Sequence, residues 1–195
     1  MSEPNIREVG VLLAAGRGER FGSHKLLASL PDGMPLAVAA ARHLIDALPD
    51  SVAVLRPGDE ILASLLAAEG LRIVVNPDAD HGMGTSLARG VAACDAGGWV
   101  IALADMPAIQ PASILAVAEA LAAGAPLAAP VYHGQRGHPI GFARRFREAL
   151  MSLAGDRGGR DILAQHAQEL RLIDVDDAGV LIDIDHPADL EKTAR

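Results

Sequence analysis

The stretch LLAAGRGERFGSHK, residues 12–25, begins as an apolar strand and continues into a glycine-rich loop. Its glycines are Gly16, Gly18 and Gly22. Its basic side chains after the strand are Arg17, Arg20 and Lys25. Glycines after a strand let backbone N–H groups approach an anion without a side chain in the way. The stretch therefore predicts a buried strand that delivers the chain to a polyphosphate, as in α/β nucleotide-binding proteins.

The rest of the chain alternates between short β-branched apolar runs and longer alanine-rich amphipathic stretches, a pattern typical of a sheet covered by helices. Strands are predicted at residues 9–14, 51–55, 71–75, 99–104, 127–131, 172–175 and 180–184. Helices are predicted at residues 36–48, 60–69, 85–93, 112–123, 144–153, 160–166 and 188–192. No repeat or linker divides the sequence. We expect residues 1–195 to form one three-layer α/β/α domain, Rossmann-like, with a mostly parallel mixed sheet.

Composition excludes several classes of function. Half of the residues are apolar, the net charge is -8, and the aromatic residues are one Trp, one Tyr and three Phe. An acidic chain with so few aromatic side chains lacks a surface for nucleic acid. Cys94 is the only cysteine, which excludes an intramolecular disulfide and a cysteine-rich metal site. No leader or membrane-spanning run is evident, so a cytoplasmic protein without a membrane partner is expected.

Ligands of open α/β sheets bind beyond the carboxyl ends of the strands, so the segments that follow the predicted strands are the candidate site. These segments are AAGRGERFGSHK (14–25), NPDADHGMGTS (76–86), DMP (105–107), HGQRGHPIGF (133–142) and DIDHP (183–187). The glycine loop differs from two common phosphate loops. Its spacing is G-x-G-x-x-x-G rather than the dinucleotide G-x-G-x-x-G, and Ser23 and His24 separate Gly22 from Lys25, unlike in a P-loop. The alternative is a surface loop with incidental charges.

The longer stretch LAAGRGERFGSHKLL, residues 13–27, resembles a nucleotidyltransferase signature, L-A-A-G-x-G-x-R-x-G-x-x-K. The proteins with this signature share a fold with sugar-nucleotide synthases. Within them, the chain is most similar to the molybdenum cofactor cytidylyltransferases, of the MobA-like NTP transferase superfamily. The resemblance continues, in the order of the family, through GMGTSL (82–87), LADMP (103–107), GHPIGF (137–142), GDRGGRDIL (155–163) and DIDHPADL (183–190).

This resemblance implies which residues bind the nucleotide. The residues implied to bind the triphosphate are Gly16, Gly18, Arg20, Gly22 and Lys25. The base is expected to contact backbone groups of Leu13, Ala14 and Ala15. A guanidinium can bind two phosphate oxygens, and a lysine offers a compact charge for a leaving pyrophosphate. Guanylyl-transferring relatives tend to carry glycine at the position of Ala15, so CTP is expected rather than GTP.

The resemblance also implies a magnesium site and Asp105 as a metal ligand. Mg²⁺ takes oxygen ligands and often bridges phosphates. The second ligand is expected to be Asp185, two residues before a proline, with Asp183 as the fallback. The alternatives are a turn residue at Asp105 and a helix N-cap at Asp183 or Asp185.

Two further sets of residues complete the expected site. Asn76, Gly84 and Ser86 belong to a nucleotide-sensing segment, although helix capping explains Thr85 or Ser86 equally well. The phosphorylated acceptor is expected at four residues, His138, Asp156, Gly158 and Arg160. The spacing of His133 and His138 does not favour zinc.

The activity implied is transfer of CMP from CTP to the terminal phosphate of molybdopterin or its molybdenum-loaded form. Arg20, Lys25 and Asp105 would be the catalytic residues, and a molybdenum hydroxylase would be a transient partner. Three alternatives stay open. They are a transferase with GTP or another phosphorylated acceptor, a non-catalytic protein that delivers cofactor to a hydroxylase, and a nicotinamide-dependent oxidoreductase, which the loop spacing disfavours.

Overall fold

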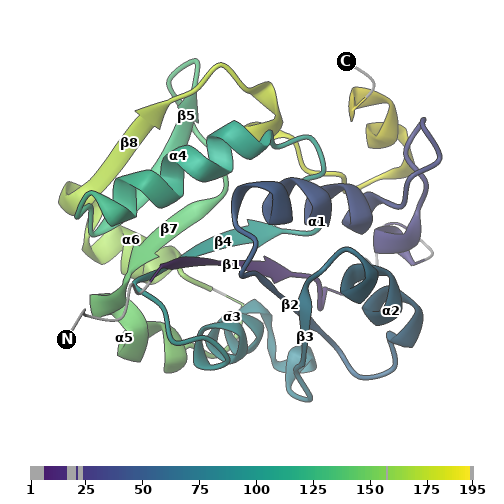
Figure 1. The fold of residues 1–195 in the computed structure, drawn as a ribbon, viewed down its shortest axis with the longest axis horizontal. Helices are drawn as coiled ribbons and strands as arrows, with labels where there is room; N and C mark the ends of the chain where they lie inside the picture. The colour runs from purple at the N-terminus through teal and green to yellow at the C-terminus, as the bar shows by residue number, and fades with distance from the viewer. Residues whose placement is uncertain (1–6, 17–20, 22–23, 157, 194–195) are drawn as a thin grey trace.

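The computed structural model describes residues 7–16, 21, 24–156 and 158–193. Its centre is one mixed sheet of eight strands in the order β3-β2-β1-β4-β7-β5-β6, with β8 paired to β5 (Figure 1). The strands are β1 Glu8–Leu13, β2 Val52–Leu55, β3 Arg72–Val75, β4 Gly98–Leu103, β5 Leu127–Tyr132, β6 Gln135–Arg136, β7 Ile140–Ala143 and β8 Leu170–Asp174. The predicted α/β fold with a mostly parallel mixed sheet is confirmed.

Strand direction decides where a ligand site can form. β1, β2, β3 and β4 run parallel, whereas β7 is antiparallel to both β4 and β5. Leu13 at the end of β1 pairs with Val54 of β2 and with Leu103 of β4. The loops that follow β1, β2 and β4 therefore leave the sheet at the same edge.

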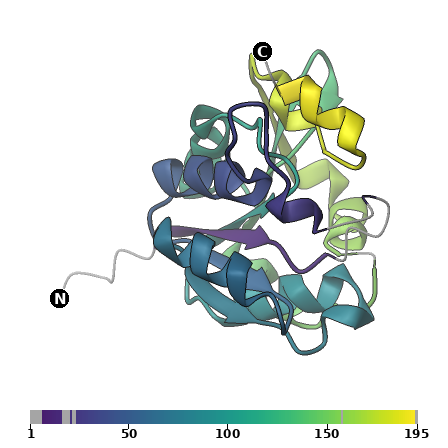
Figure 2. The same ribbon diagram turned by 90° about the vertical axis from the view of Figure 1, so that its right-hand side faces the viewer.

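Helices cover both faces of the sheet, as Figures 1 and 2 show from two sides. They are α1 Leu36–Ala47, α2 Glu60–Ala68, α3 Met83–Ala92, α4 Pro111–Ala122, α5 Arg147–Met151 and α6 Arg160–Gln165. One apolar cluster contains residues of α1, α2 and α4, and the other contains residues of α3, α5 and α6. Among the described residues, no helix is long and apolar enough to cross a bilayer.

The central strand β1 shows why the chain folds into three layers. Leu12 and Ala14 pack into the cluster of α1, α2 and α4, whereas Val11 and Leu13 pack into the cluster of α3, α5 and α6. Successive side chains of a strand point to opposite faces, so an entirely apolar strand needs cover on both sides. The sequence LLAA therefore requires helices on both faces of the sheet.

Two of the predicted late elements are wrong in type. Residues 180–184 are not a strand. A 3-10 helix covers Ala178–Leu181, and the backbone of this stretch forms hydrogen bonds with residues of loops instead of with a strand. The Val180 carbonyl accepts from the His138 N–H at 2.9 Å, and the Ile184 N–H donates to the Asp105 carbonyl at 2.9 Å. The predicted α-helix at 188–192 is a 3-10 helix, Pro187–Thr193.

Strands β6 and β7 are absent from the sequence prediction. Residues 133–142 are part of the predicted candidate site because they follow a predicted strand, yet Ile140–Ala143 forms β7 between β4 and β5 and is largely buried. Gly141 is there for packing, since a Cβ at this position would lie 2.8 Å from Cγ1 of Val117 on α4. The predicted helix at 144–153 starts as a 3-10 turn, Arg144–Phe146, before α5.

Candidate active site

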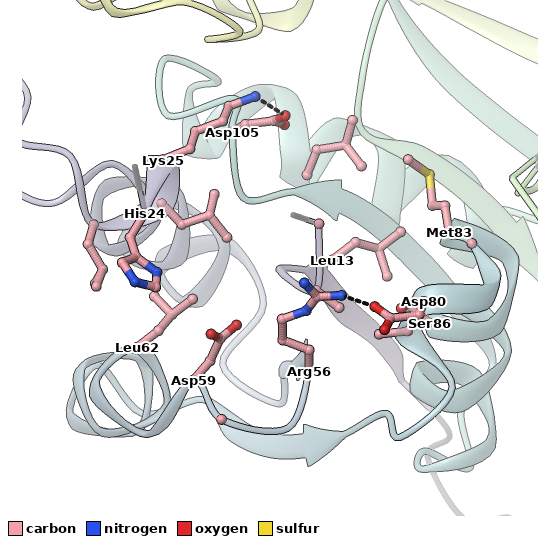
Figure 3. A pocket seen from close by; sticks show the side chains of 18 of the residues that line it. Leu13, His24, Lys25, Arg56, Asp59, Leu62, Asp80, Met83, Ser86 and Asp105 are labelled. Atoms are coloured by element: carbon pink, nitrogen blue, oxygen red, sulfur yellow. Dashed lines mark hydrogen bonds and ion pairs between the residues drawn. The ribbon is translucent and has the colours of Figure 1, made fainter. Parts of the chain in front are cut away.

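Three charged side chains far apart in the sequence meet at the carboxyl edge of the sheet. The Nζ of Lys25 lies 2.9 Å from Oδ2 of Asp105 and 2.9 Å from Oδ1 of Asp185. Lys25 opens a short 3-10 helix, Lys25–Leu27, and its side chain is only 8% exposed. Figure 3 shows the Lys25–Asp105 contact. The structure thus brings together three residues that the sequence assigns to phosphate and metal binding.

Backbone hydrogen bonds hold the two carboxylates in place. The Ala104 N–H donates to the Leu13 carbonyl at 3.1 Å, which extends the pairing of β1 with β4 up to Asp105. The hydrogen bond from the Ile184 N–H to the Asp105 carbonyl then fixes the C-terminal segment, residues 178–193, beside this turn. Ile184 is fully buried, Asp185 contacts Lys25, and Asp183 is exposed.

The turn that carries Asp185 is itself fixed by a side chain. Oδ2 of Asp189 accepts from the backbone N–H of Asp185 at 3.1 Å and from that of His186 at 2.8 Å. The side chain reaches back to N–H groups three and four residues earlier, as the acidic residue of a capping box does. Asp189, not Asp185, therefore accepts from these two N–H groups.

Charge balance keeps Lys25 protonated. Burial lowers the pKa of Lys25, but the hydrogen bonds and negative charges of Asp105 and Asp185 outweigh burial, so the pKa is raised above its ordinary value. The amine is therefore an ammonium at neutral pH. Lys25 is thus paired with both carboxylates.

The carboxylate pair fits a magnesium ion that also takes oxygens from a substrate. Mg²⁺ is commonly bound by one or two carboxylates together with phosphates and water, rather than by a cage of protein ligands. Among the described residues, no group of three or more His, Cys, Asp or Glu side chains is placed to hold a metal. Asp105 and Asp185 are the residues that would hold the ion.

A cavity of about 630 Å³ opens beside this cluster (Figure 3). It lies at the carboxyl ends of β1, β2 and β4, next to the first turn of α3. The predicted residues on its wall are Leu13, Ala15, Gly16, Lys25, Ser86, Asp105 and Asp156. Its volume is in the range of a site for a small organic ligand.

Several residues of the cavity wall escaped the sequence prediction, among them His24, Arg56, Asp59 and Met83. Arg56 forms an ion pair with Asp80 across the cavity (Figure 3). Burial raises the pKa of the Asp59 carboxyl, against the opposing charges of Arg56 and His24. The signal for Arg56 and Asp59 was present, because both follow the predicted strand at 51–55 and strand ends are where such sites form.

Other predicted nucleotide residues lie behind the wall rather than on it. The Asn76 side chain is 1% exposed, and its Nδ2 donates to Oγ1 of Thr85 at 2.9 Å and to Oγ of Ser86 at 3.0 Å. Gly84 packs against the loop at Gly155, where a Cβ would lie 2.9 Å from the Gly155 carbonyl oxygen. Ala14 belongs to the apolar core. Among the described residues, these three therefore support the cavity from outside.

Gly18, Arg20 and Gly22, which were assigned to the triphosphate, lie outside the described residues. Of the residues assigned to the acceptor, Asp156 borders the cavity and Arg160 is exposed at the start of α6.

Gly158 and His138 are also assigned to the acceptor, and the first is buried and the second half-buried. Gly158 is buried beside Met83. Burial lowers the pKa of His138, against the opposing charge of Asp105, and its buried Nδ1 has no hydrogen-bond partner among the described residues. The structure places His138 within electrostatic reach of Asp105, on the side of the C-terminal segment.

Comparison with known proteins agrees with this geometry. The family of the MobA-like NTP transferase domain matches residues 10–170, from the first strand to the start of the last. The chain belongs to this family. In this member of the MobA-like NTP transferase family, Gly16 and the LADMP aspartate Asp105 both line the cavity.

Two named relatives are similar to the chain over 90% or more of its length. The chain is 32% identical over 188 residues to the nicotine blue oxidoreductase of Paenarthrobacter nicotinovorans, which covers 90% of this chain and 91% of that protein. It is 28% identical over 201 residues to the purine catabolism protein PucB of Bacillus subtilis, which covers 96% of each.

Solved structures match over nearly the whole chain. Rv0371c of Mycobacterium tuberculosis H37Rv superposes with a TM-score of 0.84 at 25% identity, covering 97% of this chain and 99% of that one. A second structure of Rv0371c, in complex with manganese, superposes with a TM-score of 0.80 at 25% identity, covering 96% and 97%.

Proposed function

We propose that this member of the nucleotidyltransferase family transfers CMP from CTP to the terminal phosphate of molybdopterin or its molybdenum-loaded form, with Mg²⁺ as cofactor. The observation that carries the proposal is the convergence of Lys25, Asp105 and Asp185 beside a cavity at the end of β1. A metal-binding carboxylate pair next to a phosphate-binding lysine is what phosphoryl transfer needs. The manganese in the Rv0371c structure supports a divalent ion in this family.

The reaction forms a bond between an acceptor phosphate oxygen and the α-phosphorus of CTP. It breaks the bond from that phosphorus to the oxygen bridging to the β-phosphorus, and pyrophosphate leaves. The second pKa of a phosphate monoester is about 6, so the acceptor is largely ionised at neutral pH and no general base is needed. The protein must instead align two anions that repel each other and neutralise the leaving group.

The described residues supply these functions in the proposal. The ammonium of Lys25 binds the leaving phosphates, and Gly16 leaves space for them beside β1. Asp105 and Asp185 would hold a divalent metal ion, which would offset the negative charge of the phosphates. Asp156 on the cavity wall and His138 near Asp105 would contact the acceptor.

The preference for CTP rests on Ala15. Its side chain is 7% exposed and borders the cavity directly after β1. A methyl group there reduces the space next to the backbone that contacts the base. Relatives that transfer guanylyl groups tend to have glycine at this position, so the proposal is CTP in preference to GTP.

A pyrophosphate-release assay with each of the four ribonucleotides and a set of phosphorylated acceptors tests the proposal. We expect release with CTP, Mg²⁺ and a phosphorylated pterin. Lys25→Ala and Asp105→Ala should each lower turnover by about 10²-fold or more, because each removes a group that stabilises charge in the transition state. Arg42→Met, which removes an exposed charge paired with Glu69, is the control and should keep wild-type turnover.

The assay also separates the alternatives. Release with GTP or with a sugar phosphate instead would replace the named substrates and keep the reaction type. Binding of nucleotide without release from any acceptor would favour a cofactor-delivery protein for a molybdenum hydroxylase.

The name of one relative favours a second candidate function. Because the chain is 32% identical to a protein named nicotine blue oxidoreductase, an oxidoreductase reaction in the same cavity is the second candidate. A nicotinamide cofactor, which the spacing of the glycine loop disfavours, is the reductant to test. Incubation with reduced nicotinamide cofactors, followed by their absorbance, tests it. Oxidation of the reduced cofactor in the presence of an electron acceptor, with no pyrophosphate release from any nucleotide, would support this second function.

A further inference from the structure

Lys25 binds the two carboxylates that would hold a metal ion. Its Nζ lies 2.9 Å from a carboxylate oxygen of Asp105 and 2.9 Å from one of Asp185. A divalent cation held by both carboxylates would compete with this ammonium for their negative charge. Two cations close to the same carboxylates repel each other. One must leave before the other can bind.

We propose that Lys25 keeps the two carboxylates closed to a divalent cation until a nucleoside triphosphate draws its ammonium into the cavity. This inference rests on the proposed function, since it takes a triphosphate as the incoming ligand. Lysine suits this exchange because its charge is compact and its four-carbon stem is flexible. The side chain can change partners by rotation about its own bonds.

The burial of Lys25 couples this exchange to the ligand. With 8% of its side chain exposed, the ammonium has lost most of its water and depends on the two carboxylates for hydrogen bonds. A buried charge that loses its partners is strongly destabilised. The ammonium therefore leaves the carboxylates readily only when another anion replaces them.

The cavity gives Lys25 a second place for its charge. Lys25 is part of the cavity wall together with His24 and Gly16, although its ammonium is bound to the carboxylates. It follows directly on the glycine loop that the family resemblance assigns to the triphosphate. A phosphate in the cavity would thus meet the same side chain that now neutralises Asp105 and Asp185.

Coupling of the two binding events is the consequence. A metal ion that binds alone must expel the ammonium without offering it a partner, so its affinity for the free protein is low. A triphosphate removes this obstacle, and each ligand therefore strengthens the binding of the other by the same factor. Lys25 acts as an ordering device as well as a phosphate contact.

Binding of Mn²⁺ to the nucleotide-free protein tests the inference, with free Mn²⁺ measured by electron paramagnetic resonance. Lys25→Met keeps the length of the side chain but removes the ammonium. We expect this variant to bind Mn²⁺ about tenfold more tightly than the wild type, or more. Arg42→Met removes one positive charge elsewhere and is the charge-matched control, with the affinity of the wild type expected. Adding Asp105→Asn to Lys25→Met should abolish the gain.

Equal Mn²⁺ affinity of the wild type and Lys25→Met would overturn the inference, as would a gain that survives Asp105→Asn. Circular dichroism checks that each variant is folded. Lys25→Gln, which keeps a polar head group, replaces Lys25→Met if the latter does not fold. The measurement needs neither CTP nor turnover. A failure of the pyrophosphate assay would therefore leave the Mn²⁺ result standing, and the two ideas can fail separately.

Discussion

His138 is the half-buried histidine whose environment opposes protonation. Burial lowers its pKa, and its buried Nδ1 has no hydrogen-bond partner among the described residues. The charges around it are mixed, with Asp105 and Asp183 raising the pKa and Arg136 lowering it. The folded protein therefore favours the neutral imidazole.

A loss of stability below neutral pH is the first consequence. The unfolded chain titrates His138 near its ordinary pKa of about 6.5, whereas the folded chain takes up this proton only at lower pH. The stability due to neutral His138 is thus complete above the ordinary pKa and is lost as the pH falls through the lowered one. Urea unfolding from neutral to mildly acidic pH should show this loss, and His138→Gln should flatten it. An unchanged slope in His138→Gln would assign the acid sensitivity to other groups.

At the scale of elements, the C-terminal segment is what completes the candidate site. It has no strand among the described residues, and it reaches the sheet through single hydrogen bonds, such as Ile184 N–H to the Asp105 carbonyl at 2.9 Å. The 3-10 helix Pro187–Thr193 follows, and Asp189 caps the turn before it. The position of Asp185 thus depends on Asp189.

Asp189→Ala should therefore raise the Mg²⁺ concentration that the reaction needs, although Asp189 is not a proposed metal ligand. Loss of the two hydrogen bonds to the backbone of Asp185 and His186 should cost about 1 kcal/mol of local stability. We expect a several-fold rise in the Mg²⁺ concentration needed for half-maximal pyrophosphate release, with a smaller change in the maximal rate. Asp189→Asn keeps an oxygen that can accept and should restore most of the loss. If Asp189→Ala requires no more Mg²⁺ than the wild type, the cap has no role in the site.

For the whole molecule, sequence periodicity was sufficient for the layers and for the parallel half of the sheet. The apolar run through Leu12 and Leu13 requires cover on both faces, and helices follow from the amphipathic stretches. Strand β7 could not be found this way. Its four residues contain Gly141, which carries no propensity for a strand and is needed only because α4 packs closely above it.

The site was predictable in its residue types but not in its contacts. Asp105 and Asp185 follow from the resemblance to a family, and the strand-end rule points to the edge where they lie. Their contact with Lys25 joins residues 80 and 160 positions apart, so it exists only once the sheet and the C-terminal segment are assembled. Arg56 was overlooked because its loop has no glycine pattern like that of residues 16–22.

A crystal structure with CTP and Mg²⁺ would show where the two carboxylates and Lys25 bind their ligands. We expect one ion bound by both Asp105 and Asp185, with the ammonium of Lys25 moved onto the phosphates in the cavity beside β1. A structure in which Lys25 still joins the two carboxylates, while the nucleotide and ion lie elsewhere, would contradict it.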